Sequence, residues 1–270
     1  MPTLPLPGLT VIKLGGSVLT DKSRPYSLME ERIREIGKEL GEVFERMIIV
    51  HGVGSFGHPP VKEYHLYRGY ESGEDLVNLA HTQSLVFILR TRLADALRSQ
   101  GIPAMIFLPS SIIVAENEKI KEFYSEPIEK FLDLGMVPLI GGDMVYDEVR
   151  GFSVCSGDTI ALHLAARFNA KRLIFVSDVN GIYTEDPKTN ENARLIREIS
   201  LDDIQSRARV SGSAGIDVTS GMKGKIEKLK SYAHLLKDTE IVFLSMMNYG
   251  NLIGYALGES AEFTRVKIKK

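Results

Sequence analysis

The stretch MIIVHGVGSFGHPP, residues 47–60, joins a short apolar run to a loop with glycines at positions 52, 54 and 57. An apolar run that ends in closely spaced glycines is typical of a buried strand and a ligand-binding turn in a parallel α/β sheet. The glycine spacing fits the G-x-G-x-x-G pattern of dinucleotide-binding folds and also the first half of a P-loop. The loop ends in His58, where a P-loop has a lysine.

Neither of these two patterns is complete. A dinucleotide-binding loop opens a helix after its last glycine and lies in the first βα unit. This loop follows the second apolar run and continues as HPPVKEYHLYRGY, where two adjacent prolines favour an irregular segment. A P-loop needs Lys-Ser/Thr after its last glycine, and here His58-Pro59 follows. What remains is a tight glycine turn or a backbone cradle whose N–H groups converge on an anion.

The composition excludes several classes of function. The 270 residues include 33 basic and 35 acidic side chains that are interspersed, so no global field favours nucleic acid or a membrane surface. The single cysteine, Cys155, excludes an internal disulfide and a cysteine-based zinc cluster and is expected to be a buried spectator. The first ten residues lack the pattern of a secretory leader, and no uncharged stretch reaches membrane-spanning length. We expect a cytoplasmic protein.

Strand and helix patterns alternate along the chain. Ser27 and Glu30 form a capping-box pattern before a helix that extends to Phe44, and a long helical pattern covers about 74–100. The segments 111–123 and 144–154 read as β-hairpins. Further helices are expected at 125–135, 157–168 and 221–236, and strands at 9–17, 47–51, 104–109, 136–143, 172–181 and 240–245. This order predicts an α/β fold with one open, mainly parallel twisted sheet sandwiched by helices, with β-hairpin insertions.

Charged residues lie beside the glycines at the expected strand ends. Glycine-bearing loops at 15–16, 52–57, 141–142 and 181 follow four of the strands, where open parallel sheets bind ligands. Lys13 and Lys22 flank the first loop, and Lys225 begins a helix after the glycine segment DVTSGMKGK. Asp158 lies at a loop-to-helix junction, where it either caps the helix or orients the lysines. Two lysines and two glycine loops can converge on a polyphosphate.

These motifs together resemble those of one family. KLGGSVLTDK, HGVGSFGHP, GGD, SGD, SDVNGIYTEDP and DVTSGMKGK are similar, in order and spacing, to the motifs of the amino acid kinase superfamily and, within it, of the isopentenyl phosphate kinases. The resemblance covers essentially the full length. It implies a single domain of the amino acid kinase fold over 1–270, with an acceptor-substrate lobe at about 1–150, a nucleotide lobe at about 151–270, and assembly as a homodimer.

The resemblance also implies a role for individual residues. The expected catalytic residues are Lys13, Lys22, His58, Asp158 and Lys225, with Lys22 stabilising charge on the transferred phosphoryl group and Asp158 holding the lysines. The residues expected at ATP are Lys13, Gly15, Gly16, Ser17, Gly54, Asp178, Tyr183, Gly221 and Lys225. Those expected at the small-molecule acceptor are Gly16, Val53, Gly54, His58, Gly142 and Gly157. No protein ligands to a metal are expected, and Mg²⁺ is expected to be held by ATP oxygens and water.

The implied reaction is phosphorylation of isopentenyl phosphate by ATP, in an isoprenoid pathway. His58 resembles the histidine of the branch whose acceptor is a phosphate monoester or phosphonate, and it would donate a hydrogen bond to that acceptor. The apolar tail needs a pocket, for which the helix around 76–97 is the candidate wall, with Leu79, Gln83, Val86, Phe87 and Arg90 near the relevant face. For Val86 and Phe87 a place in the core is favoured over the pocket, so they are not counted as site residues. The other histidines, at 51, 65, 81, 163 and 234, match no motif and are expected to be surface or satisfied polar residues.

Other functions remain as alternatives. A fosfomycin-type kinase shares the fold and the loop histidine but accepts a phosphonate, and kinases of acetylglutamate, aspartate or UMP share the fold alone. A nucleotide-binding or storage protein without catalysis would have lost charge-stabilising residues, yet all the lysines and Asp158 are present. One departure from the family pattern is Ser220, which stands in TSG where a second glycine is expected.

Overall fold

The computed structural model describes residues 6–21, 24–207 and 221–269. In these residues the main sheet has eight strands in the order β10-β12-β11-β9-β1-β2-β6-β3, and every neighbouring pair is parallel except β11 with β12. The strands are β1 (Leu6–Leu14), β2 (Phe44–His51), β3 (Ala104–Ile106), β6 (Val137–Gly141), β9 (Arg172–Ser177), β10 (Glu198–Ser200), β11 (Glu240–Ser245) and β12 (Phe263–Lys267). The carboxyl ends of β1, β2, β6 and β9 therefore meet along one edge.

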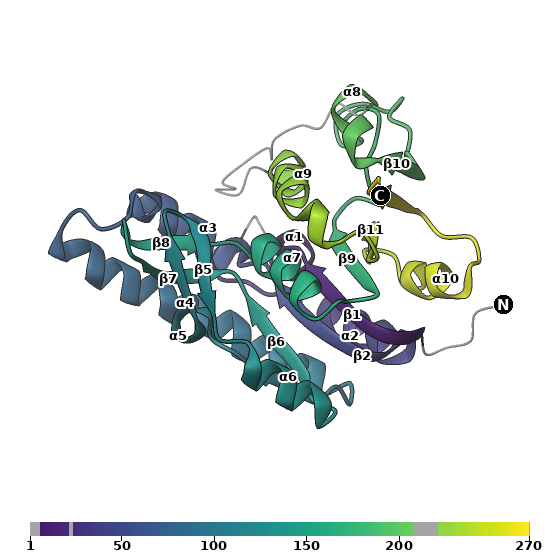
Figure 1. Ribbon diagram of the computed structural model, residues 1–270. Coiled ribbons are helices and arrows are strands. Elements are labelled where there is room, and N and C mark those ends of the chain that lie inside the picture. Colours follow the sequence, from purple (N-terminus) through teal and green to yellow (C-terminus); the bar gives the residue numbers. More distant parts are fainter. Residues whose placement is uncertain (1–5, 22–23, 208–220, 270) are drawn as a thin grey trace.

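Helices cover both faces of this sheet (Figure 1). Successive residues of a strand point to opposite faces, and Val11 packs in one buried cluster while Ile12 packs in the other. The first cluster includes side chains of α6 (Glu126–Asp133), α7 (Gly157–Arg167) and α9 (Gly221–Tyr232), and the second those of α2 (Glu30–Val43), α4 (Gly73–Arg98) and α10 (Asn251–Leu257). The sandwich predicted from the sequence is confirmed.

The two predicted hairpins join into a second sheet. Its strands β4 (Ile113–Glu116), β5 (Lys119–Phe123), β7 (Asp143–Asp147) and β8 (Gly151–Cys155) have the order β5-β4-β7-β8. The Asp147 carboxylate accepts hydrogen bonds from the N–H groups of both turns, including Glu118 at 2.8 Å and Val149 at 3.0 Å. Burial alone would raise the pKa of Asp147, but these donors lower it to about 2. The small sheet lies beside α3 and α4 (Figure 1).

The expectation of an irregular segment after the glycine loop is wrong. Helix α3 (Gly54–Glu63) begins inside that loop and contains Pro59 and Pro60. Each proline removes one backbone hydrogen bond from a helix. Burial of Phe56, Pro60 and Val61 against neighbouring elements offsets this loss, as tertiary packing often overrides local propensity.

The predicted capping box at Ser27 is also wrong. Helix α2 begins at Glu30 with Met29 as its N-cap and no side-chain cap. The carbonyl of Ser27 accepts from Asp21 N–H, and Met29 N–H donates to the carbonyl of Leu19, so this backbone is committed to pairing before the helix starts.

Short elements complete the described fold: α1 (Gly16–Leu19), η1 (Leu66–Arg68), α5 (Pro109–Ile112), η2 (Leu201–Asp203), α8 (Ile204–Arg207) and η3 (Ala233–Leu235). None of the helices in the described residues combines the length and the apolar composition needed to cross a membrane.

Candidate active site

A buried charge cluster lies at the carboxyl end of β1. Lys13 is 5% exposed, and its Nζ lies 2.8 Å from Oδ1 of Asp158 in the first turn of α7. The Nζ of Lys225, on α9, lies 3.8 Å from the other carboxylate oxygen. Ser156 is the N-cap of α7 and accepts from Thr159 N–H, so the capping role considered for Asp158 belongs to Ser156.

The cluster carries an excess of positive charge. Burial would raise the pKa of Asp158, but Lys13, Lys225 and Lys228 outweigh burial and hold that pKa well below its usual range. Asp158 is therefore ionised at neutral pH and balances only part of the charge around it. A polyphosphate is the kind of ligand that such a cluster attracts.

Lys228 was not among the predicted site residues. It lies one turn beyond Lys225 on α9, and its Nζ donates to Oγ of Ser156 at 2.8 Å. The spacing of three residues between the two lysines, which places both on one helix face, is the signal that could have identified it.

The first two glycine loops are in backbone contact beside this cluster. Gly15 N–H donates to the carbonyl of Val176 at 2.9 Å, which ties the first loop to β9. A Cβ atom on Gly16 would lie 2.6 Å from the Cα of Gly54, and Gly54 has a φ of +46° with Thr20 against the place of its missing side chain. Gly16 is therefore required for space, and Gly54 for both space and conformation. Ser17 follows in α1.

A third loop closes against the second. Gly142 N–H donates to the carbonyl of His51 at 3.0 Å, and a Cβ atom on Gly157 would lie 2.8 Å from the same oxygen. A Cβ atom on Gly142 would lie 3.2 Å from the side chain of Val53. The structure thus brings together Val53, Gly142 and Gly157, which were predicted to lie at the acceptor.

Helix α3 leads from the glycine loop to an apolar cluster. His58 is half-buried and lies four residues after Gly54, so the two share a helix face. Val61 follows after three residues and packs with Leu66, Met144 and Phe152. His58 therefore lies between the backbone loop and apolar side chains.

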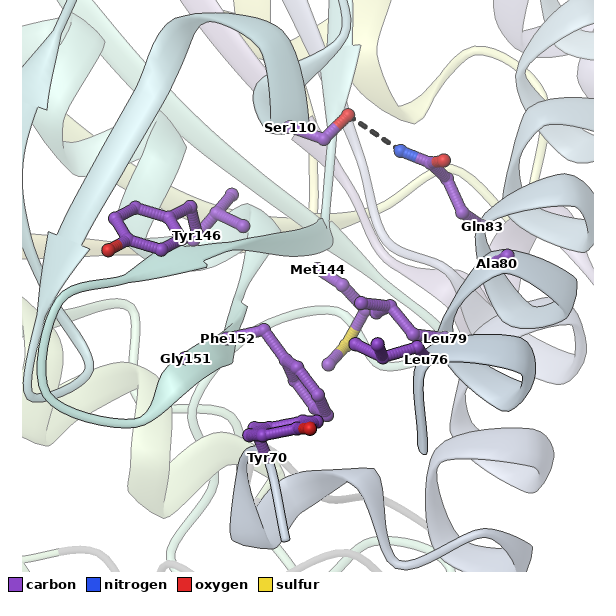
Figure 2. Close-up of a pocket in the computed structure, with 11 residues that line it drawn as sticks. Tyr70, Leu76, Leu79, Ala80, Gln83, Ser110, Met144, Tyr146, Gly151 and Phe152 are labelled. Carbon is purple, nitrogen blue, oxygen red and sulfur yellow. Dashed lines mark hydrogen bonds between the residues drawn. The ribbon is translucent and has the colours of Figure 1, made fainter. Parts of the chain in front are cut away.

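Figure 2 shows a pocket of about 410 Å³ that borders this apolar cluster. Such a volume is typical of small-molecule sites. Its lining residues come from α4, from the small sheet and from the segments beside them: Tyr70, Leu76, Leu79, Ala80, Gln83, Ser110, Met144, Val145, Tyr146, Gly151 and Phe152. Gln83 Nε2 donates to Oγ of Ser110 at 2.8 Å across it.

Two of the five wall residues predicted from the sequence line this pocket. Leu79 and Gln83 do so. Val86 is buried, as a core residue would be, whereas Phe87 is 46% exposed and the expectation that it is a core residue is wrong. Arg90 is fully buried in polar contacts.

Comparison with known proteins gives the family. The sequence pattern of the "Amino acid kinase family" matches residues 8–243. The chain belongs to the amino acid kinase family. It is 38% identical over 267 residues to isopentenyl phosphate kinase of Methanothermobacter thermautotrophicus, a match that covers 96% of this chain and 98% of the relative. It is 32% identical to isopentenyl phosphate kinase of Methanocaldococcus jannaschii, over 82% of this chain and 86% of that one.

A solved structure of an isopentenyl phosphate kinase has the same architecture. It superposes with a TM-score of 0.81 at 34% identity, and the match covers 96% of this chain and 100% of the other. The resemblance inferred from the six sequence motifs is therefore confirmed, as is the amino acid kinase fold. Kinases of this family use ATP.

The remaining residues predicted at the nucleotide lie beyond β9 and on α9. Asp178 follows β9 two residues after Val176, the partner of Gly15, and forms an ion pair with Lys188. Tyr183 pairs with Leu195 in an isolated β-bridge, and Gly221 opens α9. Lys22 and Ser220 lie outside the described residues.

The described side chains do not form a metal site of their own. Among residues 6–21, 24–207 and 221–269, no group of three or more histidine, cysteine, aspartate or glutamate side chains could hold a metal ion. Mg²⁺ bound through ATP oxygens and water stays a prediction for this kinase.

Proposed function

We propose that this chain transfers the γ-phosphoryl group of ATP to isopentenyl phosphate, forming isopentenyl diphosphate and ADP. Two relatives with that activity in their names, one of them matched over nearly its full length, support the acceptor. The observation that carries the proposal is the buried cluster of Lys13, Asp158 and Lys225 beside glycine loops in backbone contact. An apolar pocket lies next to the end of α3.

The nucleotide is proposed to bind on the C-terminal side, about residues 151–270. Lys13 and Lys225 would contact its phosphates, with Asp158 fixing the direction of both ammonium groups through the ion pairs described above. Gly15, Gly16, Ser17 and Gly54 would supply loop contacts, and Asp178, Tyr183 and Gly221 would border the nucleotide. Lys228, whose charge also lowers the pKa of Asp158, adds positive charge at this end.

The acceptor phosphate is proposed to lie on the N-terminal side, about residues 1–150. The N–H groups of a helix's first turn have no acceptor inside the helix. In α3, Ser55 donates to Thr20 and Phe56 donates to the carbonyl of Val53. The N–H of Gly54 is proposed to donate to the acceptor phosphate, together with contacts from Gly16, Val53, Gly142 and Gly157. His58, one turn further along, would donate a hydrogen bond to the same phosphate.

The proposed step is an in-line displacement. An oxygen of the acceptor phosphate forms a bond to the γ-phosphorus as the bond from that phosphorus to the β–γ bridging oxygen breaks, and ADP leaves with the electron pair. A phosphate monoester has a second pKa near 6 and is already ionised at pH 7, so no general base is required. Catalysis by this chain then consists of alignment and of charge stabilisation by lysines and amides. Lys22 is proposed to stabilise negative charge on the phosphoryl group during its transfer.

The apolar pocket is proposed to hold the isopentenyl tail. Its lining is mostly apolar, and the polar groups of Gln83 and Ser110 are hydrogen-bonded to each other. At about 0.8 kcal/mol per buried carbon, a five-carbon tail gains up to about 4 kcal/mol of binding free energy. This gain favours an alkenyl phosphate over phosphonates or nucleotides that lack such a tail.

The test is a coupled assay of ADP release with Mg-ATP and four acceptors: isopentenyl phosphate, fosfomycin, UMP and N-acetylglutamate. We expect isopentenyl phosphate to give much the highest kcat/KM. A preference for fosfomycin would leave the proposed site unchanged but show that the acceptor is a phosphonate. Inactivity with all four would favour a nucleotide-binding protein without catalysis.

The homodimer and the magnesium requirement also belong to this proposal. Light scattering of the purified chain measures its mass in solution and would contradict the dimer if it gave the 30.0 kDa of a single chain. Chelation with EDTA, followed by addition of Mg²⁺, is expected to abolish and then restore turnover.

A further inference from the structure

A buried polar network lies between the pocket and the glycine loops. It consists of His51 at the end of β2, Arg90 on α4 and Asp143 at the start of β7, which are 0%, 0% and 4% exposed. Arg90 Nε donates to Nε2 of His51 at 3.0 Å, and two of its other nitrogens donate to Oδ2 of Asp143 at 3.3 Å. The expectation that His51 is a satisfied polar residue is confirmed.

This network carries a cost in stability. Each ion removed from water costs several kcal/mol, and an apolar cluster of similar volume often packs with equal or greater stability. Burial lowers the pKa of Arg90 and raises that of Asp143, and their mutual attraction opposes both shifts. The role of this network therefore lies in the backbone groups that it holds in place.

The network holds the backbone of two glycine loops. Arg90 also donates to the carbonyl of Gly142 at 3.3 Å, and Nδ1 of His51 donates to the carbonyl of Gly52 at 3.1 Å. Because Nε2 of His51 accepts from Arg90, the proton of the neutral ring is on Nδ1. Burial, with the positive charge of Arg90 nearby, lowers the pKa of His51 to about 3, so the ring is neutral at physiological pH.

Fixing a carbonyl also fixes the next amide. The C=O of Gly52 and the N–H of Val53 belong to one planar peptide and point in opposite directions. Holding the Gly52 oxygen against His51 in the interior therefore turns the Val53 N–H outward, to the side where the acceptor phosphate is proposed. Bulk at Gly141 is excluded because the His51 ring fills the place of its side chain.

The same network joins the two walls of the pocket. Gln83 and Arg90 are seven residues apart on α4 and lie on one helix face, and Gln83 lines the pocket. Asp143 directly precedes Met144 and Val145, which line the opposite side from β7. The contact between Arg90 and Asp143 thus spans from one wall to the other.

We propose that Arg90 is a positioning residue that couples occupancy of the apolar pocket to the geometry of the phosphate-binding loops. This inference rests on the proposed function, because it assigns the tail and the phosphate of one acceptor to the two regions that the network connects. A tail in the pocket sets the spacing of α4 and β7, and Arg90 transmits that spacing to the carbonyls of Gly52 and Gly142. An acceptor without a tail binds the same loops but aligns less well for transfer.

The test compares acceptors with and without a tail. We would measure kcat and KM for isopentenyl phosphate and for methyl phosphate at saturating ATP. The tail factor is the kcat for isopentenyl phosphate divided by the kcat for methyl phosphate. The variants are Arg90→Gln and Asp143→Asn, with Arg92→Gln, an exposed arginine on the same helix, as the matched control. Since a misplacement of 1 Å can cost about 100-fold in rate, we expect Arg90→Gln to lower the tail factor at least about tenfold. The KM for ATP and the control are expected to stay within about twofold.

Each other outcome has a defined meaning. A wild-type tail factor near one, or an equal fall in kcat for both acceptors, would overturn the coupling and leave the network a structural role. If circular dichroism shows that Arg90→Gln does not fold, the nearly isosteric Asp143→Asn decides by the same ratio.

Failure of the proposed function would be visible separately. If the wild-type chain does not turn over isopentenyl phosphate, calorimetric titration of isopentenyl phosphate and of inorganic phosphate replaces the rate measurement. The coupling then predicts that Arg90→Gln reduces the ratio of the two affinities at least about tenfold, and an unchanged ratio would overturn it.

Discussion

The two ends of the candidate active site are built in different ways. At the phosphate end, position is set by backbone and buried charge: Gly16 and Gly54 leave no room for a side chain, and Lys13 lies 2.8 Å from Asp158. At the tail end, side chains of α4 and of the small sheet surround an open pocket. The comparison teaches that the first region fixes the reacting groups directly, whereas the second supplies affinity for the tail and acts on alignment only through Arg90. Substitutions at the phosphate end should therefore reduce kcat, and shortening a pocket side chain while the tail still binds should mainly raise KM.

The largest effect is expected from the lysines of the phosphate end. Lys225→Met removes an ammonium group that faces Asp158 and the proposed ATP phosphates, and kcat should fall by about 100- to 1000-fold. Lys223→Met, two residues earlier on α9 and exposed, is the matched control and should retain nearly full activity. Steady-state kinetics with isopentenyl phosphate measure both. An equal loss in the two variants would show that general charge, not position, is what matters.

The next effect concerns the residue between the two ends. His58→Asn shortens the proposed donor to the acceptor phosphate, and kcat should fall about 100-fold, with ATP affinity unchanged by calorimetry. His65→Asn is the control, because His65 is exposed and has a φ of +53°, a conformation that asparagine tolerates. Near-normal turnover of His58→Asn would remove this histidine from the mechanism.

A smaller effect is expected in the stability of the phosphate end toward acid. The pKa of His51 is about 3 in the folded chain and about 6.5 when unfolded, so the unfolded chain binds more protons between these values. The stabilisation is complete above pH 6.5 and is lost as the pH falls toward 3. From pH 7 to pH 5 this residue should cost about 2 kcal/mol of unfolding free energy, a change of about 20- to 30-fold in the unfolding equilibrium.

Urea unfolding at the two pH values measures this loss. His51→Gln removes the titrating ring and should flatten the dependence, whereas the exposed His81→Gln should retain it. A dependence that is the same in wild type and His51→Gln would contradict the assignment.

The smallest effect is expected at the tail end. Leu79→Ala removes apolar contact area from the pocket, and KM for isopentenyl phosphate should rise about tenfold, as expected for loss of about 1.4 kcal/mol. The kcat value should change by less than about twofold. Val77→Ala is the control because Val77 is 70% exposed on the same helix. A fall in kcat without a rise in KM would show that Leu79 contributes to alignment and not to affinity for the tail.

The phosphate end could be predicted from the sequence for a physical reason. Its residues follow strands directly, and a parallel sheet brings all such strand ends to one edge. Lys13, Gly54 and Asp158 were found by position alone, and the structure brings them together. Lys228 was missed because a single lysine on a helix is ordinarily a surface residue.

The tail end could not be predicted in the same way. Tyr70 precedes α4, Ser110 lies on α5, and Met144 and Phe152 belong to one hairpin, so their meeting depends on how that hairpin packs beside α4. Periodicity in α4 identified Leu79 and Gln83 but could not separate the pocket face from the buried face at Val86. β10 and β12 were also not predicted, since they have three and five residues with few apolar positions.

The central place of β1 has a consequence for how the chain is made. Thr10 of β1 pairs with Arg172 of β9, and Lys13 needs the carboxylate of Asp158. During synthesis the ribosome releases β1 and β2 long before β9 and Asp158 are made. The apolar strand β1, with a lysine that becomes buried, therefore lies in an incomplete sheet until then. Contacts between residues so far apart in sequence slow folding and prolong exposure to aggregation. A nascent chain that stops before Arg172 can pair β1, β2, β6 and β3 but lacks β9, so one edge of the apolar strand β1 stays open until the C-terminal strands are made.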